Sequence, residues 1–484
     1  MKWWNQLAGK RLVYITLGLT GVCIGLVIGR SVFVAMPLVL LLFSVILVIG
    51  RKQSIAYCVA SLLVGLLLGN VRGHVFSNSI ARYDALYGTS VTVRGPVVDD
   101  PGYNDRKMIE FHIGEPIINN TQLPGKVRIR TLRAGTISRG DIVVASGSLR
   151  ETLGTGRQGS IGFANVQVLE EDNSLVERIR TRFFSSVFSA LPEPQASLGL
   201  GYLAGVRSTL PPEFAEALAI VGLTHIVAVS GYNLTIIVQF VKRFFERVSA
   251  YQTVFFSIVL IAGFLLVTGW SPSITRAALI SVLSLAAWYF GRSFYPLVII
   301  LIGAAVTAFI NPLYIWGDVG WYLSFLAFAG VLIIAPLVLL LFGKWGKNIL
   351  LAVLAETLAA QLVTAPYIAY IFGRISVISP IANLLVIPFI PLAMLLVFVT
   401  GVVGMASPTL ALWVAVPARI LMSFTVWVVE ALAKIPWAQS SLKLQLWQMT
   451  VIYTVLGAVT FLSWALYRAR ARRSHSEQID WNLL

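Results

Sequence analysis

The chain has 484 residues, of which 57% are hydrophobic and 12% are charged, and its mean hydropathy is +0.82. Soluble domains are about 45–50% apolar and about 25% charged, so this composition excludes a cytosolic enzyme, a disulfide-stapled secreted domain and a disordered scaffold. It indicates an integral membrane protein. Both cysteines, Cys23 and Cys58, lie in apolar stretches, and the four histidines are scattered. We therefore expect neither a disulfide framework nor a familiar metal site.

The net charge is +16, from 37 basic and 21 acidic residues, and the excess lies mainly in and beside the apolar segments. Residues 71–172 are close to neutral, whereas the segments on either side are basic. Two interpretations remain open. The charges hold connecting loops on the cytoplasmic side of a membrane, or they line a path for an anionic substrate.

Three apolar runs open the chain, at about 12–29, 31–50 and 54–70, each close to the ~20 residues that a spanning helix needs. Together they form a predicted N-terminal membrane segment, residues 1–70. Basic residues precede the first run and follow the second, so the positive-inside rule places the N-terminus in the cytoplasm. After three spans, the chain is expected outside the membrane at residue 71.

Residues 71–172 differ in kind from the flanking segments. Short stretches in which apolar and polar residues alternate, such as 90–95, 126–130 and 141–147, are separated by turn-rich segments. This pattern predicts a small antiparallel barrel or sandwich, and about five strands in about 100 residues favour an OB-like barrel. The span count places this domain outside the membrane. It carries a basic stripe suited to nucleic acid: Lys126, Arg128, Arg130 and Arg133.

Residues 173–194 are predicted to form an amphipathic helix at the membrane interface, because apolar side chains fall on one side with arginines between them. The chain then returns to the membrane as a channel-type domain, residues 195–467. Its expected spans lie near 217–241, 252–269, 273–290, 293–310, 319–342, 348–372, 377–404, 410–433 and 447–466.

The spans total about 12, and a basic tail, residues 468–484, follows the last one. Both termini are expected in the cytoplasm, since most basic connections then lie inside. Three basic residues fall outside against this rule: Arg374, Lys434 and Lys443.

The most unusual stretch is 222–233, where His225, Ser230 and Asn233 interrupt a run of membrane length. Polar groups in hydrocarbon must find partners within the protein, and a Ser-Gly step opens a helix where it faces a cavity. The stretch is therefore a candidate cavity lining. The alternative is a helix-packing patch in which His225 bonds a neighbouring helix.

Three further polar residues stand out within the later apolar segments. Arg276 is expected about one turn inside a span that begins at Pro272. Facing a cavity, its planar guanidinium would suit phosphate oxygens, and otherwise it snorkels to the outer interface. Asp318 lies at the outer end of a later span and is a candidate partner for Arg276. Asn383 stands among prolines, which break helices and free carbonyl groups, as in transport pathways.

No soluble-enzyme motif is present, since the sequence has no Walker A run and no His-Glu-x-x-His segment. We therefore expect no enzymatic activity and no cofactor. His225 and Ser230 are five residues apart and would point about 140° apart on a helix. A catalytic dyad at these positions requires a break in that helix.

On these residues the chain resembles the ComEC family of competence proteins, in which four motifs occur in the same order. The resemblance is strong over about 195–450 and looser over 1–190. The His…Ser-Gly motif is similar to Gly205, Gly222, His225, Ala228, Ser230 and Gly231, and Pro-Ser-x-x-Arg-Ala to Pro272, Ser273, Arg276 and Ala277. The remaining two motifs are similar to residues 318–327 and to Pro366, Phe372, Gly373, Ser376, Pro380, Ala382 and Asn383.

Three departures from the family pattern bear on function. Asn233 stands where the family has a second histidine, which leaves a hydrogen-bonding role there, and Tyr322 stands where the family has glutamine. Many members continue into a metallo-β-lactamase-like nuclease domain, whereas this sequence ends at Leu484 without such a run of metal ligands. We therefore expect any degradation of one DNA strand to come from a separate protein.

The resemblance implies an inner-membrane channel that moves single-stranded DNA into the cytoplasm during natural transformation, with the OB-like domain receiving the DNA. The expected path residues are His225, Ser230, Asn233, Arg276, Asp318 and Asn383. Single-stranded DNA, membrane lipids and separate receptor, nuclease and motor proteins are the implied partners, and a homo-oligomer is left open. Two alternatives remain: a transporter of another anionic polymer or lipid-linked precursor, and a membrane-embedded hydrolase that uses His225 and Ser230.

Overall fold

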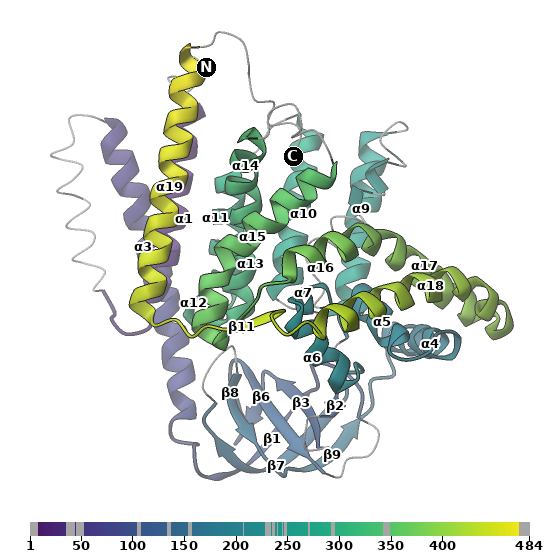
Figure 1. The fold of residues 1–484 in the computed structure, drawn as a ribbon. Helices are drawn as coiled ribbons and strands as arrows, with labels where there is room; N and C mark the ends of the chain where they lie inside the picture. Colours follow the sequence, from purple (N-terminus) through teal and green to yellow (C-terminus); the bar gives the residue numbers. More distant parts are fainter. Residues whose placement is uncertain are drawn as a thin grey trace.

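The structure is a computed structural model. It describes residues 8–34, 44, 53–103, 108–132, 137–152, 157–206, 208–227, 234, 238–239, 241–243, 245, 249–269, 272–291, 296–341 and 349–473. The described part is mostly helical, and a β-sheet domain lies at one end of the helices (Figure 1).

Helices α1 (Ala8–Gly29) and α3 (Gln53–Ile80) lie side by side along most of their length. Glycines line their contact: a Cβ atom added at Gly25 would collide with the backbone of α3, and one added at Gly65 with the backbone of α1. The same holds along the rest of this glycine seam, at Gly21, Gly29, Gly69 and Gly73. Small residues let helix backbones approach closely, which is how many membrane helices associate.

The two helices run parallel, since Gly18 lies against Ser61 and Gly29 against Asn70. The second predicted span, 31–50, lies largely outside the described residues. The third predicted span, now helix α3, continues past its predicted end at residue 70. Its last turns are held by hydrogen bonds to another helix. Arg72 donates from Nε to the Phe309 carbonyl at 3.0 Å and from Nη2 to the Ile310 carbonyl at 2.9 Å. Those carbonyls end helix α11 (Pro296–Ile310).

The β-sheet domain contains nine strands: β1 (Ser90–Pro96), β2 (Gly102–Tyr103), β3 (Ile109–Gly114), β4 (Ile117–Ile118), β5 (Thr121–Gln122), β6 (Lys126–Thr131), β7 (Ile142–Arg150), β8 (Arg157–Ile161) and β9 (Asn165–Glu170). The predicted strands at 90–95, 126–130 and 141–147 are confirmed as β1, β6 and β7. Alternate residues of β1 and β6 are buried, as a strand with one core-facing side requires.

Five of these strands follow one another around a ring. Antiparallel pairs join β1 to β7, β7 to β8 and β3 to β6, and a bridge between Val97 and Ile113 joins the end of β1 to β3. The expectation of a wholly antiparallel sheet is wrong at one pair, because β6 and β8 run parallel. The chain reverses twice, through β7, between these two strands. The five strands enclose a hydrophobic core whose fully buried residues include Val93, Phe111, Ile129, Leu149 and Ile161.

Helix α4 (Leu175–Ala190) leads from the sheet back to the other helices. Ser174 caps it by accepting the Glu177 N–H at 3.2 Å. Arg180, predicted among the polar residues of an amphipathic helix, is instead 5% exposed and pairs with Asp100 of the β-sheet domain and with Glu177. Burial of this arginine is tolerated because both carboxylates face it.

The remaining helices are α5 (Gln195–Ala204), α6 (Pro212–Ile220), α7 (Thr224–Val227), α9 (Ala250–Thr268), α10 (Pro272–Tyr289), α12 (Leu313–Gly317), α13 (Val319–Ala329), α14 (Ala335–Leu341), α15 (Ile349–Phe372), α16 (Ser379–Val386), α17 (Ile390–Ala406), α18 (Pro408–Ala433) and α19 (Leu446–Arg473). A π-helical segment, Gly330–Ile334, joins α13 to α14, and the short strands β10 (Arg374–Ser376) and β11 (Gln439–Ser441) pair.

Eight described helical segments are long and apolar enough to cross a membrane: Leu12–Gly29, Tyr57–Tyr83, Ala250–Thr268, Val319–Leu340, Leu351–Phe372, Ser379–Ala406, Pro408–Ala433 and Leu446–Leu466. Two shorter apolar helices, Ile274–Tyr289 and Val298–Ile310, match two more predicted spans. The predicted span at 217–241 is wrong as one continuous helix. Helix α6 ends at Ile220, and Gly222 turns the chain with φ of 74° before α7 begins.

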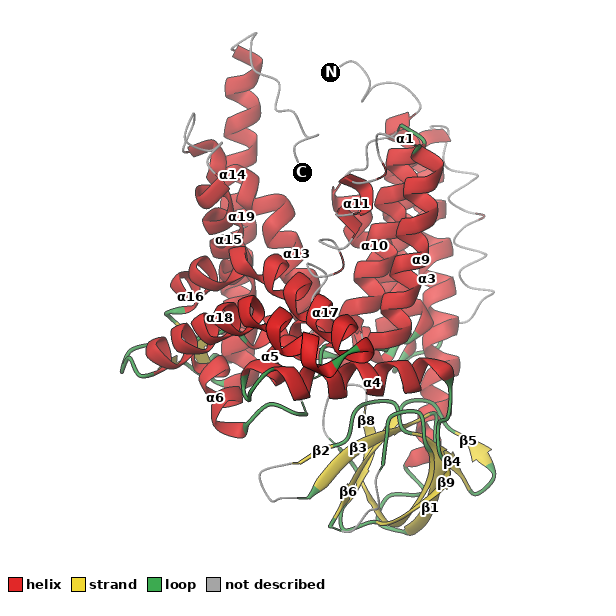
Figure 2. Ribbon diagram, turned by 90° about the vertical axis from the view of Figure 1, so that its right-hand side faces the viewer, coloured by secondary structure: helices red, strands yellow, loops and turns green. Residues whose placement is uncertain are grey.

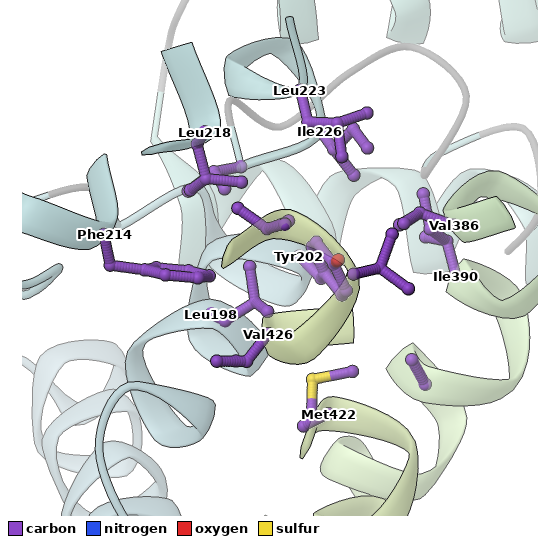
Figure 3. Close-up of a cluster of buried hydrophobic side chains, with 14 of the residues drawn as sticks. Leu198, Tyr202, Phe214, Leu218, Leu223, Ile226, Val386, Ile390, Met422 and Val426 are labelled. Carbon is purple, nitrogen blue, oxygen red and sulfur yellow. The ribbon is translucent and has the colours of Figure 1, made fainter. Parts of the chain in front are cut away.

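Helices α17 and α18 run across the direction of α3, α9 and α19, with α4 beside them (Figures 1 and 2). A buried apolar cluster ties this crosswise group to α5, α6 and α7 (Figure 3). Its labelled members are Leu198, Tyr202, Phe214, Leu218, Leu223, Ile226, Val386, Ile390, Met422 and Val426. The cluster fixes the Gly222 turn against α16, where the candidate polar residues lie.

Candidate functional site

Arg276 is a buried cation within the membrane-type helices. It lies one turn into α10, which begins at Pro272 as predicted, and it is 5% exposed. Its guanidinium carbon lies 5.1 Å from the centre of the Phe325 ring of α13, and its Nη1 atom has no hydrogen-bond partner. The snorkelling alternative is therefore wrong: the side chain points into the protein.

Gly303 and Phe325 pack closely around Arg276. Gly303 of α11 faces the arginine, and a Cβ atom there would lie 3.8 Å from Arg276 Cγ and 3.4 Å from the Phe325 ring. Trp321 completes this wall. Its ring lies 4.8 Å from Phe325, and its Nε1 donates to Thr307 Oγ1 at 2.9 Å. A buried donor without a partner costs about 1–3 kcal/mol, so this site favours a ligand that brings an acceptor oxygen.

Asp318 holds the start of the helix that carries Phe325. Its Oδ1 atom accepts the Trp321 N–H at 2.7 Å, which caps α13. None of the ion pairs between described residues joins Asp318 to Arg276. Asp318 and Arg276 are thus connected only indirectly among the described residues: Asp318 caps α13, and Phe325 of α13 contacts Arg276. Asp318 is therefore positioned to orient Phe325 and Trp321.

The turn that precedes His225 lies in a second polar region, a corner where Gly222 packs against Ser376 of β10 and Ser379 of α16. His225 itself is exposed. Its Nδ1 atom is 3.0 Å from the Gly222 carbonyl oxygen. A Cβ atom added at Gly222 would lie 2.8 Å from Ser379 Oγ and 3.0 Å from Ser376 Cβ. Only glycine fits here, since φ is positive and Ser376 and Ser379 crowd the site.

Asn383 belongs to the same corner. Its Nδ2 atom donates to Ser379 Oγ at 3.3 Å, and Gln361 Nε2 donates to the Ser376 carbonyl at 2.9 Å. Three buried side-chain oxygen atoms there have no hydrogen-bond partner: Gln361 Oε1, Ser376 Oγ and Asn383 Oδ1. The structure therefore brings the His225 segment and Asn383 to one polar corner. The other two candidates of that segment, Ser230 and Asn233, lie outside the described residues.

The predicted basic stripe lies on β6, where Lys126, Arg128 and Arg130 alternate with buried residues. An acidic residue on β3 opposes it: Glu110 accepts from Arg130 Nε at 2.9 Å and lies 3.6 Å from Arg128 Nη1. The stripe is therefore partly neutralised. Arg133 lies outside the described residues.

Sequence reasoning missed Arg139, which joins the β-sheet domain to the membrane-type helices. Its Nη1 atom donates to the Val267 carbonyl at 2.9 Å and its Nη2 atom to the Leu266 carbonyl at 3.2 Å. A cation at this end of α9 meets the negative end of the helix dipole. Burial, and then the nearby Arg180, lower the pKa of Arg139 from its ordinary value. No local signal marked it, because its acceptors are 127 and 128 residues away.

Among the described residues, no group of three or more His, Cys, Asp or Glu side chains is arranged to hold a metal ion. The apolar helices long enough to span a membrane, together with one β-sheet domain at their end, define a multi-pass membrane protein. The sequence model of the family described as "Competence: Competence protein" matches residues 202–466, more than half of the chain. The chain belongs to this competence protein family, the ComEC family.

One relative is ComE operon protein 3 of Bacillus subtilis (strain 168), which is 26% identical over 226 residues. The match covers 46% of this chain and 28% of that protein. No solved structure matches the chain. The family match contains both the Arg276 site and the polar corner of His225 and Asn383.

Proposed function

We propose that this protein is a membrane channel that passes single-stranded DNA into the cytoplasm during DNA uptake. The observation that carries the proposal is Arg276: a 5% exposed guanidinium with an unpartnered Nη1 atom among apolar helices. A phosphate oxygen would supply the missing acceptor, and the planar fork of arginine suits phosphate. Membership of the competence protein family supports DNA as the source of that phosphate.

The β-sheet domain is proposed to be an OB-like barrel that receives the strand. The ring of β1, β3, β6, β8 and β7, with its single parallel pair, supports this assignment. OB folds bind oligonucleotides on the face of their second and third strands. In this domain those strands are β3 and β6, and β6 carries Lys126, Arg128 and Arg130.

The proposed topology keeps both termini in the cytoplasm and the β-sheet domain outside. Two contacts support it. Arg139 of that domain bonds the C-terminal end of α9, and Arg72 of α3 bonds the C-terminal end of α11. Both helices thus end on the side of the β-sheet domain. The sequence segments that precede them, 242–247 and Arg292, are basic, which agrees with cytoplasmic connections under the positive-inside rule.

Within the membrane, Arg276 is proposed to contact the backbone phosphates of the strand. Asp318 positions α13, and His225 and Asn383 offer polar groups along the path, together with Ser230 and Asn233. The chain itself is proposed to act without enzymatic activity or cofactor. Separate proteins would then bind the DNA, degrade one strand and pull the other inward: a receptor, a nuclease and a motor. Membrane lipids and further copies of the chain are the other proposed partners.

The test follows labelled double-stranded DNA into a nuclease-protected cytoplasmic pool. It compares cells with the intact protein, without it, with Arg276→Ala, and with Arg374→Ala as an exposed-arginine control. Loss of uptake in the deletion and in Arg276→Ala, with surface binding retained, supports the channel. Unchanged uptake in the deletion would overturn it.

A second candidate is a transporter of another anionic polymer or a lipid-linked precursor. The observation that favours it is Glu110, which pairs with Arg130 and lies close to Arg128, so that the domain offers less positive charge to DNA. Failure of residues 71–172 to bind single-stranded DNA would favour this alternative.

A further inference from the structure

Helices α17 and α18 form a hairpin whose orientation differs from that of the other long apolar helices. In two perpendicular views the hairpin runs across the direction of α3, α9 and α19, at the level where the β-sheet domain meets the helices (Figures 1 and 2). Its main contacts are with α4, α5, α6 and α16. Length and apolar composition allow both helices to span a membrane, but they do not fix orientation.

The charge of α18 argues against a crossing. Arg419 lies near the middle of this helix, which runs from Pro408 to Ala433, and its side chain is exposed. If α18 crossed the bilayer, this guanidinium would face lipid at the centre of the hydrocarbon, which is costly for any charged side chain. In a helix that lies along the interface, the same side chain reaches the phosphates of the headgroups.

The turn of the hairpin gives a second, independent argument. Five segments are proposed to be cytoplasmic, and each contains lysine or arginine: 51–52, 242–247, 292, 344–347 and 468–473. Residues 401–411, which would form the cytoplasmic turn if the hairpin crossed, contain neither. The positive-inside rule therefore does not place this turn in the cytoplasm.

The exposed face of the hairpin has the composition of an interfacial surface. Trp413, Ile420 and Trp427 follow one another at intervals of seven residues and are 76%, 67% and 64% exposed. Tryptophan is enriched where a membrane meets water. Helix α4 packs against α17, with the Phe183 ring on Gly401, and exposes Arg178 and Arg182 to anionic headgroups.

We propose that α17 and α18 do not cross the bilayer but lie along its interface on the side of the β-sheet domain, in contact with phospholipid headgroups. From Ile390 onward, the two predicted spans at 377–404 and 410–433 then form one hairpin at the membrane surface. Removing this pair leaves both termini on the same side as before. The proposal rests on the proposed placement of the β-sheet domain outside the membrane.

The test is the sidedness of single cysteines in the full chain, after replacing Cys23 and Cys58 by alanine. Ser407→Cys reports the hairpin turn, Thr121→Cys the β-sheet domain, and Arg243→Cys the opposite, proposed cytoplasmic side. A membrane-impermeant maleimide is applied to spheroplasts and to inverted vesicles, and labelling in detergent shows that each cysteine is reactive in the folded protein.

We expect Ser407→Cys to escape labelling in inverted vesicles, where Arg243→Cys reacts. We expect Ser407→Cys to react in spheroplasts, as Thr121→Cys does, or to react only in detergent if lipid shields the turn. Labelling of Ser407→Cys in inverted vesicles, with Thr121→Cys reacting only in spheroplasts, overturns the proposal and leaves the proposed topology of the β-sheet domain intact. Labelling of Thr121→Cys in inverted vesicles overturns that topology instead.

Discussion

The guanidinium of Arg276 lies over the ring of Phe325, 5.1 Å from its centre, while its Nη1 atom has no hydrogen-bond partner. A cation held by an aromatic face on one side and left without an acceptor on the other is poorly arranged for stability. It is well arranged to receive an anion, because the donor is already desolvated and fixed in direction. Stability and transport should therefore respond in opposite directions to its removal.

Replacing Arg276 with methionine separates these two effects. Methionine fills similar space without the unpaired donor, so we expect the free energy of unfolding to be unchanged or higher, by up to about 3 kcal/mol. DNA uptake should fall to the level of the deletion. Arg276→Lys keeps the charge but loses the planar fork, so its uptake should be intermediate. Thermal unfolding in detergent and uptake are the two measurements, and full uptake by Arg276→Met contradicts the role.

Asp318 should act through the helix that it caps. Asp318→Ala removes the acceptor for the Trp321 N–H and should lower stability by about 1 kcal/mol, with a partial loss of uptake because α13 carries Phe325. Asp318→Ser keeps a capping oxygen without the charge, so it should restore both quantities. If Asp318→Ser loses as much uptake as Asp318→Ala, the charge itself is needed and the positioning role is wrong.

Sequence patterns located most helices and the main strands because these follow from local chemistry. The predicted span at 252–269 is α9, and the strand at 126–130 is β6, since hydropathy and alternation depend on neighbours along the chain. The break at Gly222 depends on Ser376 and Ser379, which are more than 150 residues away, so no local window contains its cause.

The candidate site shows the same division. Helix α10 begins at Pro272, as the sequence pattern predicts. That pattern left open whether Arg276 is buried, and the ring that Arg276 contacts is Phe325, not the predicted partner Asp318. Pairing between spans is a tertiary property, and hydropathy does not encode it. For the same reason, apolar length identified α17 and α18 as helices without fixing their orientation.

The glycine seam between α1 and α3 predicts a sharp difference between two glycines. A Cβ atom at Gly65 would collide with the backbone of α1, which cannot move aside as a side chain does. Gly65→Ala should therefore cost about 1–3 kcal/mol of stability. Gly263→Ala in α9 is the matched control, because no atom lies within 4 Å of its Cβ position and alanine favours the helix. Thermal unfolding in detergent measures both, and equal effects would contradict the close contact.

The pairing of Glu110 with the basic stripe of β6 yields a prediction for DNA binding. Glu110→Gln removes the carboxylate that holds Arg130 at 2.9 Å and lies 3.6 Å from Arg128, so both guanidiniums become available to phosphate. We expect the full chain in detergent to bind labelled single-stranded DNA more tightly. Its salt dependence should steepen by about 0.7 for each added phosphate contact. Glu115→Gln makes the same charge change at an exposed position paired with Gln122, so it should leave affinity nearly unchanged. Equal gains in the two variants would mean that only net charge matters and that the β6 stripe is not the binding face.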